Sequence, residues 1–197
     1  MARTRAIDYS DKQQTILTAA ARLFGEHGFE RVSMAAVAVE CGFSKALLYH
    51  YYSSKEALLD DIIMRHLERL IAAVSTANAS ASEPRDRLLA MVTAVLLSYQ
   101  EDADQHRVQQ GSQASMSAAK QDTMKALERT LVQQFSDALL QAVPRLQERP
   151  EVLQPVTMSL FGMLNWTYTW FKDGGAMDRS HYAEIVTTLM LDGAKAL

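Results

Sequence analysis

Apolar residues recur at intervals of three and four along most of the chain, which predicts amphipathic α-helices rather than strands. No run of residues alternates apolar and polar positions over the length of a strand. The four prolines and eight glycines are few, and we expect them between the helices. The pattern therefore predicts an all-α protein of about nine helices.

The N-terminal part of the chain holds three predicted helices. Ser10 or Asp11 can cap the first helix, and Gly28 ends it. Ser33 and Ser44 stand where N-caps of the second and third helices are expected. The predicted ranges are about 11–27, 34–41 and 45–52.

A longer series of helices follows. Ser53 or Ser54 is expected to cap a fourth helix that ends near Val74. The small and polar residues of 75–84 predict a loop, and the Gln, Ser and Gly residues of 109–117 predict a mobile or short-helical connection. Pro144 and Pro155 are expected to bound a break in the helices. The remaining helices are predicted over about 83–101, 118–142, 152–172 and 179–196.

Charge divides the chain unevenly. Residues 1–56 carry seven Lys or Arg and six acids, a net charge of +1, whereas the whole chain has a net charge of -3. The rest of the chain is therefore acidic, at -4. This asymmetry weakly favours a nucleic-acid-binding N-terminal end. We expect a boundary between a first domain, 1–56, and a second, 57–197.

The segment from Ser33 to Ser44 has the pattern of a helix-turn-helix, two short helices joined by a tight turn that contains glycine. Gly42 allows the sharp turn, and Ser44 caps the second helix. At 100° per residue, Leu48 and Tyr52 share the face that packs onto the first and fourth helices. The opposite arc offers Lys, Ala, Tyr and His side chains, which suit phosphates and base edges in the major groove of DNA.

This region resembles the DNA-binding signature of the tetracycline-repressor family. The resemblance rests on Gly42-Phe-Ser-Lys-Ala-Leu-Leu-Tyr-His-Tyr-Tyr-Ser-Ser-Lys-Glu-Ala-Leu58 and, upstream, on Ala19-Ala-Ala-Arg-Leu-Phe-Gly-Glu-His-Gly-Phe29. It implies an all-α homodimer whose N-terminal three-helix domains bind a palindromic operator in double-stranded DNA. The C-terminal helical bundle would bind a small inducer and form the dimer through the last two helices. At position 41 the family more often has alanine, and at position 33 threonine.

The resemblance also implies roles for single residues. Ser33, Ser44 and Lys55 would anchor the domain on the DNA backbone. The residues that would face the groove are Lys45, Ala46, Tyr49, His50 and Tyr51. A lysine at the start of a helix opposes the helix dipole, so a nearby phosphate would explain Lys55, although a solvent-exposed lysine is the simpler interpretation.

The stretch from Leu160 to Phe171 is rich in aromatic residues. A helix over it places Phe161, Asn165 and Tyr168 on one side, and Trp166 and Trp170 on nearly the opposite side. A helix that is apolar on both sides must be buried on both, one against its own bundle and the other against a dimer partner or a ligand cavity.

The order of Gly162, Asn165, Trp166, Trp170, Phe171, Asp173 and Gly174 also resembles the branch of the family that responds to acyl-coenzyme A thioesters of fatty-acyl or phenylacetyl type. That resemblance implies an apolar pocket for the acyl group beside this helix. Its other expected lining residues are Met91, Val95, Tyr99, Met124, Leu127 and Leu131. Arg107, Lys120, Lys125 or Arg129 would meet the phosphates of the coenzyme.

Other function classes lack support in the sequence. The chain has no HExxH, Gly-rich phosphate-loop or GxSxG motif, and its five histidines show no metal-ligand spacing, so we expect no enzyme, catalytic residue, metal or cofactor. A single cysteine, Cys41, and the absence of an apolar signal or membrane span predict a soluble, cytoplasmic protein. The function predicted from the helix-turn-helix and the family resemblance is a ligand-controlled transcription repressor. The alternatives are an activator, a regulator with a hydrophobic inducer other than a coenzyme A thioester, and an architectural DNA-binding protein without an effector.

Overall fold

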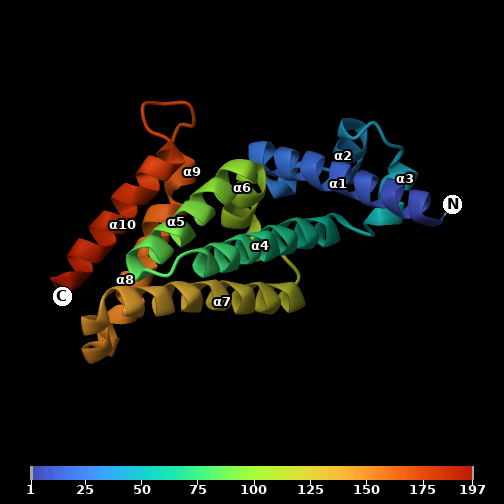
Figure 1. Ribbon diagram of the computed structural model, residues 1–197. Helices are drawn as coiled ribbons and strands as arrows, with labels where there is room; N and C mark the ends of the chain where they lie inside the picture. Colours follow the sequence, from blue (N-terminus) through green and yellow to red (C-terminus); the bar gives the residue numbers. More distant parts are fainter. Residues whose placement is uncertain (1, 197) are drawn as a thin grey trace. The chain divides into compact units, whose positions relative to one another are not determined.

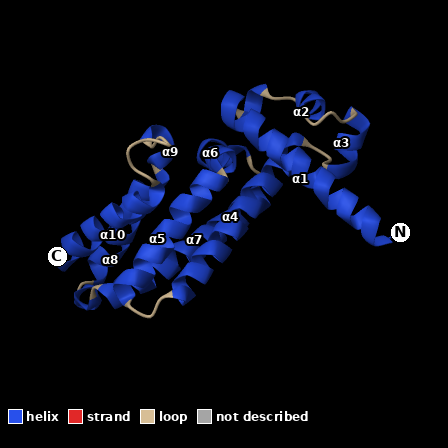
Figure 2. Ribbon diagram, turned by 45° about the horizontal axis from the view of Figure 1, so that its top comes forward, coloured by secondary structure: helices blue, strands red, loops and turns tan. Residues whose placement is uncertain are grey.

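The computed structural model describes residues 2–196, with side chains described from Tyr9 to Ala196. Within these residues the regular structure is helical, without a strand (Figure 2). Nine α-helices have seven residues or more, and a tenth, α9, has four. The prediction of an all-α protein of about nine helices is therefore confirmed.

The helices follow one another in the order drawn in Figure 1. Their bounds are α1 Ala2–His27, α2 Met34–Glu40, α3 Lys45–Tyr51, α4 Lys55–Ser80, α5 Pro84–Glu101, α6 Ala103–Ser112, α7 Ala118–Ala142, α8 Pro150–Asn165, α9 Thr167–Trp170 and α10 Arg179–Lys195. Short 3-10 turns lie between some of them, at η1 Phe29–Arg31, η2 Gln113–Ser115 and η3 Pro144–Glu148.

The chain divides into two compact units. The first, here the head unit, consists of the residues up to His66 together with Asp104–Met124. The second, here the body unit, consists of Leu67–Ala103 and the chain from Lys125 onward. The predicted boundary lies after residue 56. The boundary between these units instead falls within α4, and α6 and the start of α7 belong to the head unit.

The head unit is built around α1, α2 and α3. Ile16, Val37, Leu48 and Leu58 are fully buried, one each from α1 to α4. Each of them lies on the apolar side of its helix. Burial of these side chains therefore holds the short α2 and α3 in place. This packing leaves the far side of α3 exposed.

The body unit has one apolar core, to which α4, α5, α7, α8 and α10 contribute. Phe135 of α7 is fully buried, and its ring meets that of Phe161 of α8 edge-on, with 5.1 Å between centroids. A hydrogen bond between side chains also joins two of the helices: the side-chain amide of Gln134 of α7 donates to the hydroxyl of Ser75 of α4 at 3.1 Å. The core fixes the positions of the body helices through many distant contacts.

Three predicted helix limits are wrong. Ser10 and Asp11 do not cap α1, because the helix continues back to Ala2. The predicted loop over 75–84 is short, since α4 continues to Ser80, with its last turns held by burial of Val74. Pro155 does not bound a break: α8 begins at Pro150 and continues through Pro155, which removes one helical amide bond without ending the helix.

Apart from the end of α8, which is described with the site below, the other limits agree closely with the predictions. Ser33, Ser44 and Ser54 each accept a backbone amide hydrogen bond at the start of a helix. The helix predicted over 118–142 is α7, with the same bounds. The region of 109–117 contains the end of α6 and the η2 turn, as a short-helical connection requires.

Candidate functional site

Local side-chain bonds set the geometry of α2 and α3. The Oγ of Ser33 accepts a hydrogen bond from the amide of Ala36, and the Oγ of Ser44 accepts one from the amide of Leu47, each at 3.1 Å. Between the two helices Gly42 has a φ of 68°, a left-handed conformation that favours glycine. The predicted turn and both predicted N-caps are therefore confirmed.

The inner face of α3 is anchored to α1 and α4. Leu48 is fully buried, and the hydroxyl of Tyr52, just beyond the helix, donates to Asp61 of α4 at 2.6 Å. The side-chain amide of Gln13 of α1 donates to the same hydroxyl at 3.2 Å. Burial, and after it the hydrogen bond to Asp61, raises the pKa of Tyr52. These contacts fix the rotation of α3 about its axis, and so determine which residues face outward.

The outer arc of α3 is polar and accessible. Lys45, Ala46, Tyr49 and His50 are all exposed, as predicted. The ammonium of Lys45 lies 5.8 Å from the centroid of the Tyr49 ring, which holds the two side chains on one side of the helix. This arc presents a cation, a phenol and an imidazole on a rigid helix, a set that can bind phosphates and base edges.

Tyr51 is half-buried, with an aromatic neighbour that sequence reasoning missed. Its ring stacks on that of Tyr9 of α1, with 4.5 Å between centroids and 28° between planes. The ring of His50 meets Tyr51 edge-on at 5.7 Å. Tyr9 lies outside the helix that the periodicity predicted, so its position beside α3 had no signal in the sequence.

The ammonium of Lys55 binds atoms of the head unit. It donates to the carbonyl oxygens of Phe29 at 2.9 Å and Glu30 at 3.4 Å, and lies 4.2 Å from the centroid of the Phe29 ring. Lys55 therefore ties the start of α4 to the η1 turn. A contact between Lys55 and a DNA phosphate stays a prediction.

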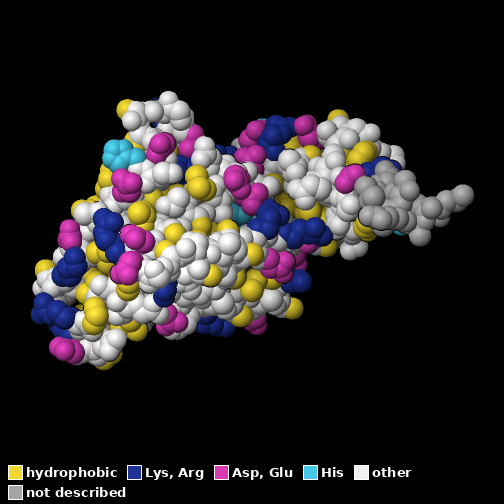
Figure 3. Space-filling model, viewed as in Figure 1, with side chains coloured by type: hydrophobic (Ala, Val, Ile, Leu, Met, Phe, Trp, Pro, Cys, Tyr) yellow, Lys and Arg dark blue, Asp and Glu magenta, His cyan; other side chains and the backbone are white. Residues whose placement is uncertain are grey.

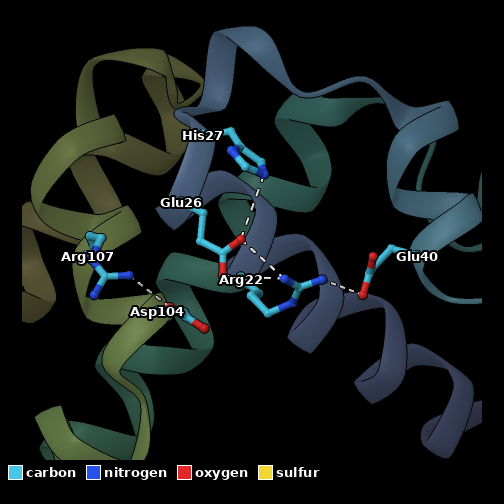
Figure 4. A network of polar contacts seen from close by, with 6 residues as sticks. All are labelled: Arg22, Glu26, His27, Glu40, Asp104 and Arg107. Carbon is cyan, nitrogen blue, oxygen red and sulfur yellow. Dashed lines mark hydrogen bonds and ion pairs between the residues drawn. The ribbon is translucent and has the colours of Figure 1, made fainter.

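A polar network ties α1 to α2 on another side of the head unit (Figure 4). Arg22 of α1 forms ion pairs with Glu40 at the end of α2 and, at 3.2 Å, with Glu26 one turn along α1. The hydrogen bond that Arg22 donates to Glu40, and the negative charge of that carboxylate, raise the pKa of Arg22 above the ordinary value for arginine. Arg22 thus keeps the end of α2 close to α1, next to the turn at Gly42.

Five of the predicted effector residues lie in the core of the body unit. Met91, Val95, Tyr99, Leu131 and Phe161 all belong to this one buried cluster. Leu127 is half-buried on the same helix as Leu131.

Three of the predicted effector residues, Arg107, Lys120 and Met124, belong to the head unit instead. Arg107 is exposed and pairs with Asp104 at 3.0 Å, whereas Met124 is buried. Lys120, Lys125 and Arg129 are exposed on α7. The spacing in the sequence therefore gave no guide to which unit each residue joins.

The aromatic stretch does not form one continuous helix, contrary to the prediction. The helix α8 ends at Asn165, where the Oδ1 of Asn165 accepts a hydrogen bond of 2.7 Å from the hydroxyl of Tyr99 of α5. The hydroxyl of Thr167 then donates to the carbonyl of Leu164 at 2.7 Å, in competition with the helical amide bonds. Tyr168 therefore does not share a face with Phe161 and Asn165.

Trp166, Tyr168 and Trp170 are exposed, at 62%, 41% and 50% of their surfaces, rather than buried on two sides. Met158, on the Trp166 side of α8, and Leu189 of α10 are also exposed. A hollow of about 540 Å³ lies beside the outer side of α10, with Leu89, Ile185 and Leu189 in its lining. The body unit thus exposes five large apolar side chains between α8 and α10.

On the face drawn in Figure 3, basic and acidic side chains are interspersed over the body helices. Among the described residues, no three His, Cys, Asp or Glu side chains come together as metal ligands would. No helix in the described part of the chain has the length and apolar character to cross a membrane.

Both parts of the chain match known sequence families. Residues 16–62 match the tetR family of bacterial regulatory proteins, and residues 81–194 match the tetracyclin repressor-like C-terminal domain. The HTH-type transcriptional regulator UidR of Escherichia coli K12 is 46% identical over 57 residues, which are 29% of this chain and 29% of UidR. The chain thus spans less than a third of the length of that curated relative.

Similarity to solved structures extends over nearly the whole chain. A TetR-family transcriptional regulator from Bordetella parapertussis is 34% identical, with a TM-score of 0.87, over 94% of this chain and 96% of that one. AibR, solved in complex with isovaleryl coenzyme A and operator DNA, is 26% identical, with a TM-score of 0.76, over 92% of this chain and 97% of AibR. The domain matches and the Bordetella structure together show that this chain belongs to the tetR family of bacterial transcriptional regulators.

Proposed function

We propose that this protein is a ligand-responsive transcriptional repressor that binds a palindromic operator as a homodimer and leaves it when a small hydrophobic inducer binds. The observation that carries the proposal is α3, a helix capped at its start, anchored on its inner face and exposed along its outer arc. Such a helix can enter the major groove without further rearrangement, because its position on the head unit is already fixed.

Within this proposal the residues of α3 divide the work. Tyr49 and His50 have hydrogen-bonding groups for base edges, and Ala46 offers a small apolar contact for a thymine methyl group. Lys45 at the start of the helix neutralises a phosphate. Ser33 and Ser44 lie at the starts of α2 and α3, where hydroxyl and amide groups can meet the phosphates that border the groove.

The exposed apolar side chains of α8 and α10 support a second copy of the chain as the dimer partner. Met158, Trp166 and Leu189 are large and exposed, and Trp is enriched among the residues that contribute most to binding energy at interfaces. A two-fold dimer would place two α3 helices on successive major grooves, about 34–36 Å apart. Its test is the molar mass in solution: Met158→Asp with Leu189→Asp should give monomers, and unchanged dimers would refute this interface.

For the inducer we propose an acyl-coenzyme A thioester with a short or medium acyl chain. AibR was solved with isovaleryl coenzyme A, and it is similar to this chain over nearly its whole length. The body core is apolar and includes polar pairs, among them Tyr99 with Asn165 and Ser136 with Thr157, and polar groups set in an apolar lining are typical of ligand sites. A hydrophobic inducer without coenzyme A would use the same lining, and the binding experiment below separates the two.

The response to inducer is proposed to travel along α4. Residues 55–66 of this helix belong to the head unit and residues 67–80 to the body unit, so one helix is part of both. A ligand that binds one conformation of the body more tightly shifts α4 and with it the spacing of the two heads. A disulfide between cysteines at Ser75 and Gln134, in a Cys41→Ala background, should abolish the ligand response; a retained response would refute this path.

The decisive experiment measures DNA binding by fluorescence anisotropy with the purified full chain. The probe is duplex DNA from upstream of its own gene, titrated with and without isovaleryl, fatty-acyl and phenylacetyl coenzyme A and the free acids. We expect tight binding that an acyl-coenzyme A weakens at least tenfold. His50→Ala should weaken binding to the operator about 5- to 150-fold, as loss of a base contact predicts, and Gln147→Ala, an exposed residue of the body, should not change it.

Three outcomes would count against the proposal. Failure to bind any palindromic upstream DNA would refute the regulatory role. Binding that no ligand changes would favour an architectural protein, and release by the free acids alone would favour a hydrophobic inducer without coenzyme A. Expression of a reporter from the same upstream DNA should rise when the chain is deleted; a fall would show an activator.

A further inference from the structure

The head unit contains a hollow of about 420 Å³. One of its walls is the end of α1 with the η1 turn, and the other is α6 with the η2 turn. All of the residues that line it belong to the head unit, whereas the proposed inducer site lies in the body. Its volume is within the range of small-molecule sites in proteins, about 300–1,000 Å³.

Side-chain contacts hold the two walls in place. The hydroxyl of Ser115 of η2 donates to the carboxylate of Glu30 of η1 at 3.2 Å. The ammonium of Lys55 donates to the carbonyl of Phe29 at 2.9 Å, which fixes η1 against the start of α4. At Gly25 of α1, an added Cβ would lie 3.6 Å from the side chain of Arg107 of α6, so this side chain packs over the glycine. The hollow therefore lies between walls that contact each other at several points.

A glycine keeps the hollow open on the α6 side. Gly111 lines it in the last turn of α6, and a Cβ added there would meet no atom within 4 Å. Neither close packing nor a left-handed φ requires glycine at this position, although glycine is less favourable than alanine in a helix. A larger side chain here would enter the hollow. Gly111 thus suits a helix that leaves room for a bound molecule.

The charged groups around the hollow favour an anion. Its lining includes the guanidinium groups of Arg31 and Arg107 and one carboxylate, that of Glu30. Arg107 pairs with Asp104 at 3.0 Å, but its side chain is still 43% exposed, so it can bind a further anion. Figure 4 shows Arg107 on α6 and, at the end of α1, His27, whose imidazole also belongs to the lining. Arginine binds carboxylates and phosphates through paired hydrogen bonds.

A buried hydroxyl and two aromatic rings complete the lining. Ser112 is 8% exposed, and among the described residues its hydroxyl has no hydrogen-bond partner. An unsatisfied buried hydroxyl costs free energy, which an oxygen atom of a ligand would recover. The rings of Phe24 and Phe29, both buried, meet edge-on with 5.2 Å between centroids. A few polar groups set beside apolar side chains are typical of small-molecule sites.

We propose that this hollow is a second ligand site, which binds a small organic anion that carries a carboxylate or a phosphate ester. Arg31 and Arg107 bind the charged group, and the hydroxyl of Ser112 donates to one of its oxygens. The bound anion joins α6 to the η1 turn and so stabilises the folded head unit by mass action. This site depends neither on DNA binding by α3 nor on an inducer in the body.

The test measures binding to the unaltered full chain by isothermal titration calorimetry. The probes are citrate, which carries carboxylates, and glycerol 3-phosphate, with glycerol as the neutral control. We expect at least one anion to bind with a Kd below about 1 mM and glycerol not to bind. Binding by citrate alone would assign the site to carboxylates, and binding by glycerol 3-phosphate alone would assign it to phosphate esters. If neither anion binds, the proposal is refuted.

Two variants of the lining should weaken binding. Arg31→Gln with Arg107→Gln removes both cationic donors and should raise the Kd at least about tenfold. Gly111→Leu fills the hollow and should abolish binding, while the fold is kept because the added Cβ meets no atom. Circular dichroism checks the fold of each variant. Binding that persists unchanged in both would show that the anion binds elsewhere and would overturn the proposal.

Charge provides a test in the opposite direction. Glu30→Gln removes the one carboxylate of the lining but keeps an oxygen that can accept from Ser115, so it should strengthen anion binding about threefold. The matched control, Lys125→Gln with Arg129→Gln, removes two exposed cations of the body unit and should change the Kd less than about twofold. A loss in this control equal to that of the arginine variant would reduce the effect to net charge and contradict a site in the hollow.

Hydrogen–deuterium exchange locates the bound anion independently. The probe that binds should slow exchange of the backbone amides in residues 28–31 and 107–115, the segments that form the two walls. Slower exchange confined to the body unit would refute the proposed site.

Discussion

Residues 33–52 and residues 150–179 both contain a helix, a break and a further short helix, but their geometry has different causes. In the first stretch, α2 and α3 begin at serines that bind amides three residues away, and the turn needs only Gly42. In the second, α8 ends where Asn165 accepts a hydrogen bond from Tyr99, 66 residues earlier in the chain. The first geometry is local, and the second depends on the packed body.

This difference has a physical consequence for each stretch. A helix fixed by caps and a turn keeps its outer face open, because its limits need no neighbours on that side. A helix fixed by distant partners owes its limits to the core, so loosening of the core changes them. The limits of α3 should therefore survive changes in the body core, whereas those of α8 should not.

The largest expected effect tests the dependence of α8 on the core. Phe161 is 5% exposed and packs edge-on against Phe135, so Phe161→Ala should lower the free energy of unfolding by about 3–5 kcal/mol, from lost burial and the cavity left behind. Urea unfolding followed by circular dichroism measures it. Gln154→Ala, an exposed change on the same helix, should stay within about 0.5 kcal/mol. Equal losses for the two variants would show that α8 does not depend on the core.

A smaller effect tests the local cap of α3. Ser44→Ala removes the oxygen that accepts the amide of Leu47 and should cost about 1 kcal/mol, together with weaker DNA binding as the first turn of α3 frays. Ser53→Ala is the matched control, since Ser53 is exposed and Ser54 is the residue that caps α4. The measurements are thermal unfolding and anisotropy on the upstream duplex. If Ser53→Ala cost as much, capping would not explain the geometry of α3.

The smallest expected effect concerns the segment after α9. Hydrogen bonds from Arg179 lower the pKa of Asp173, so the folded state favours the carboxylate. The stability from this pair is present above the ordinary aspartate pKa of about 3.9 and is lost as the pH falls through the lower folded value. The difference in unfolding free energy between the unaltered chain and Asp173→Asn should be constant from about pH 7 to 5 and shrink below about pH 4. A difference that stays the same as the pH falls from about 5 to about 2 would contradict the role of Arg179.

Features that depend on neighbouring residues could be predicted from the sequence. The caps at Ser33 and Ser44, the turn at Gly42 and the exposed arc of α3 were predicted, because each depends on residues within four positions. The periodic helix α7 was also predicted, with the same bounds.

What the sequence could not show depends on distant contacts. The periodicity of the aromatic stretch continues past Asn165, whereas the helix ends there, beside the hydrogen bonds of Asn165 with Tyr99 and of Thr167 with Leu164. The stack of Tyr9 on Tyr51 joins residues 42 positions apart, so the predicted α1 began at Asp11 and excluded Tyr9. For the same reason Arg107, Lys120 and Met124 were predicted in the second domain, whereas they belong to the head unit.

A serine hydroxyl can accept one hydrogen bond and donate another. The oxygen of Ser44 is occupied as an acceptor of the amide of Leu47, but its hydrogen is still available to donate. One hydroxyl can therefore start the helix and bind a phosphate at the same time. Aspartate caps a helix as well as serine does, but it has no hydrogen to donate when ionised, and its charge repels phosphate. With DNA binding as proposed above, Ser44→Asp would keep the helix but weaken its binding to DNA. This variant would separate two roles that the serine combines.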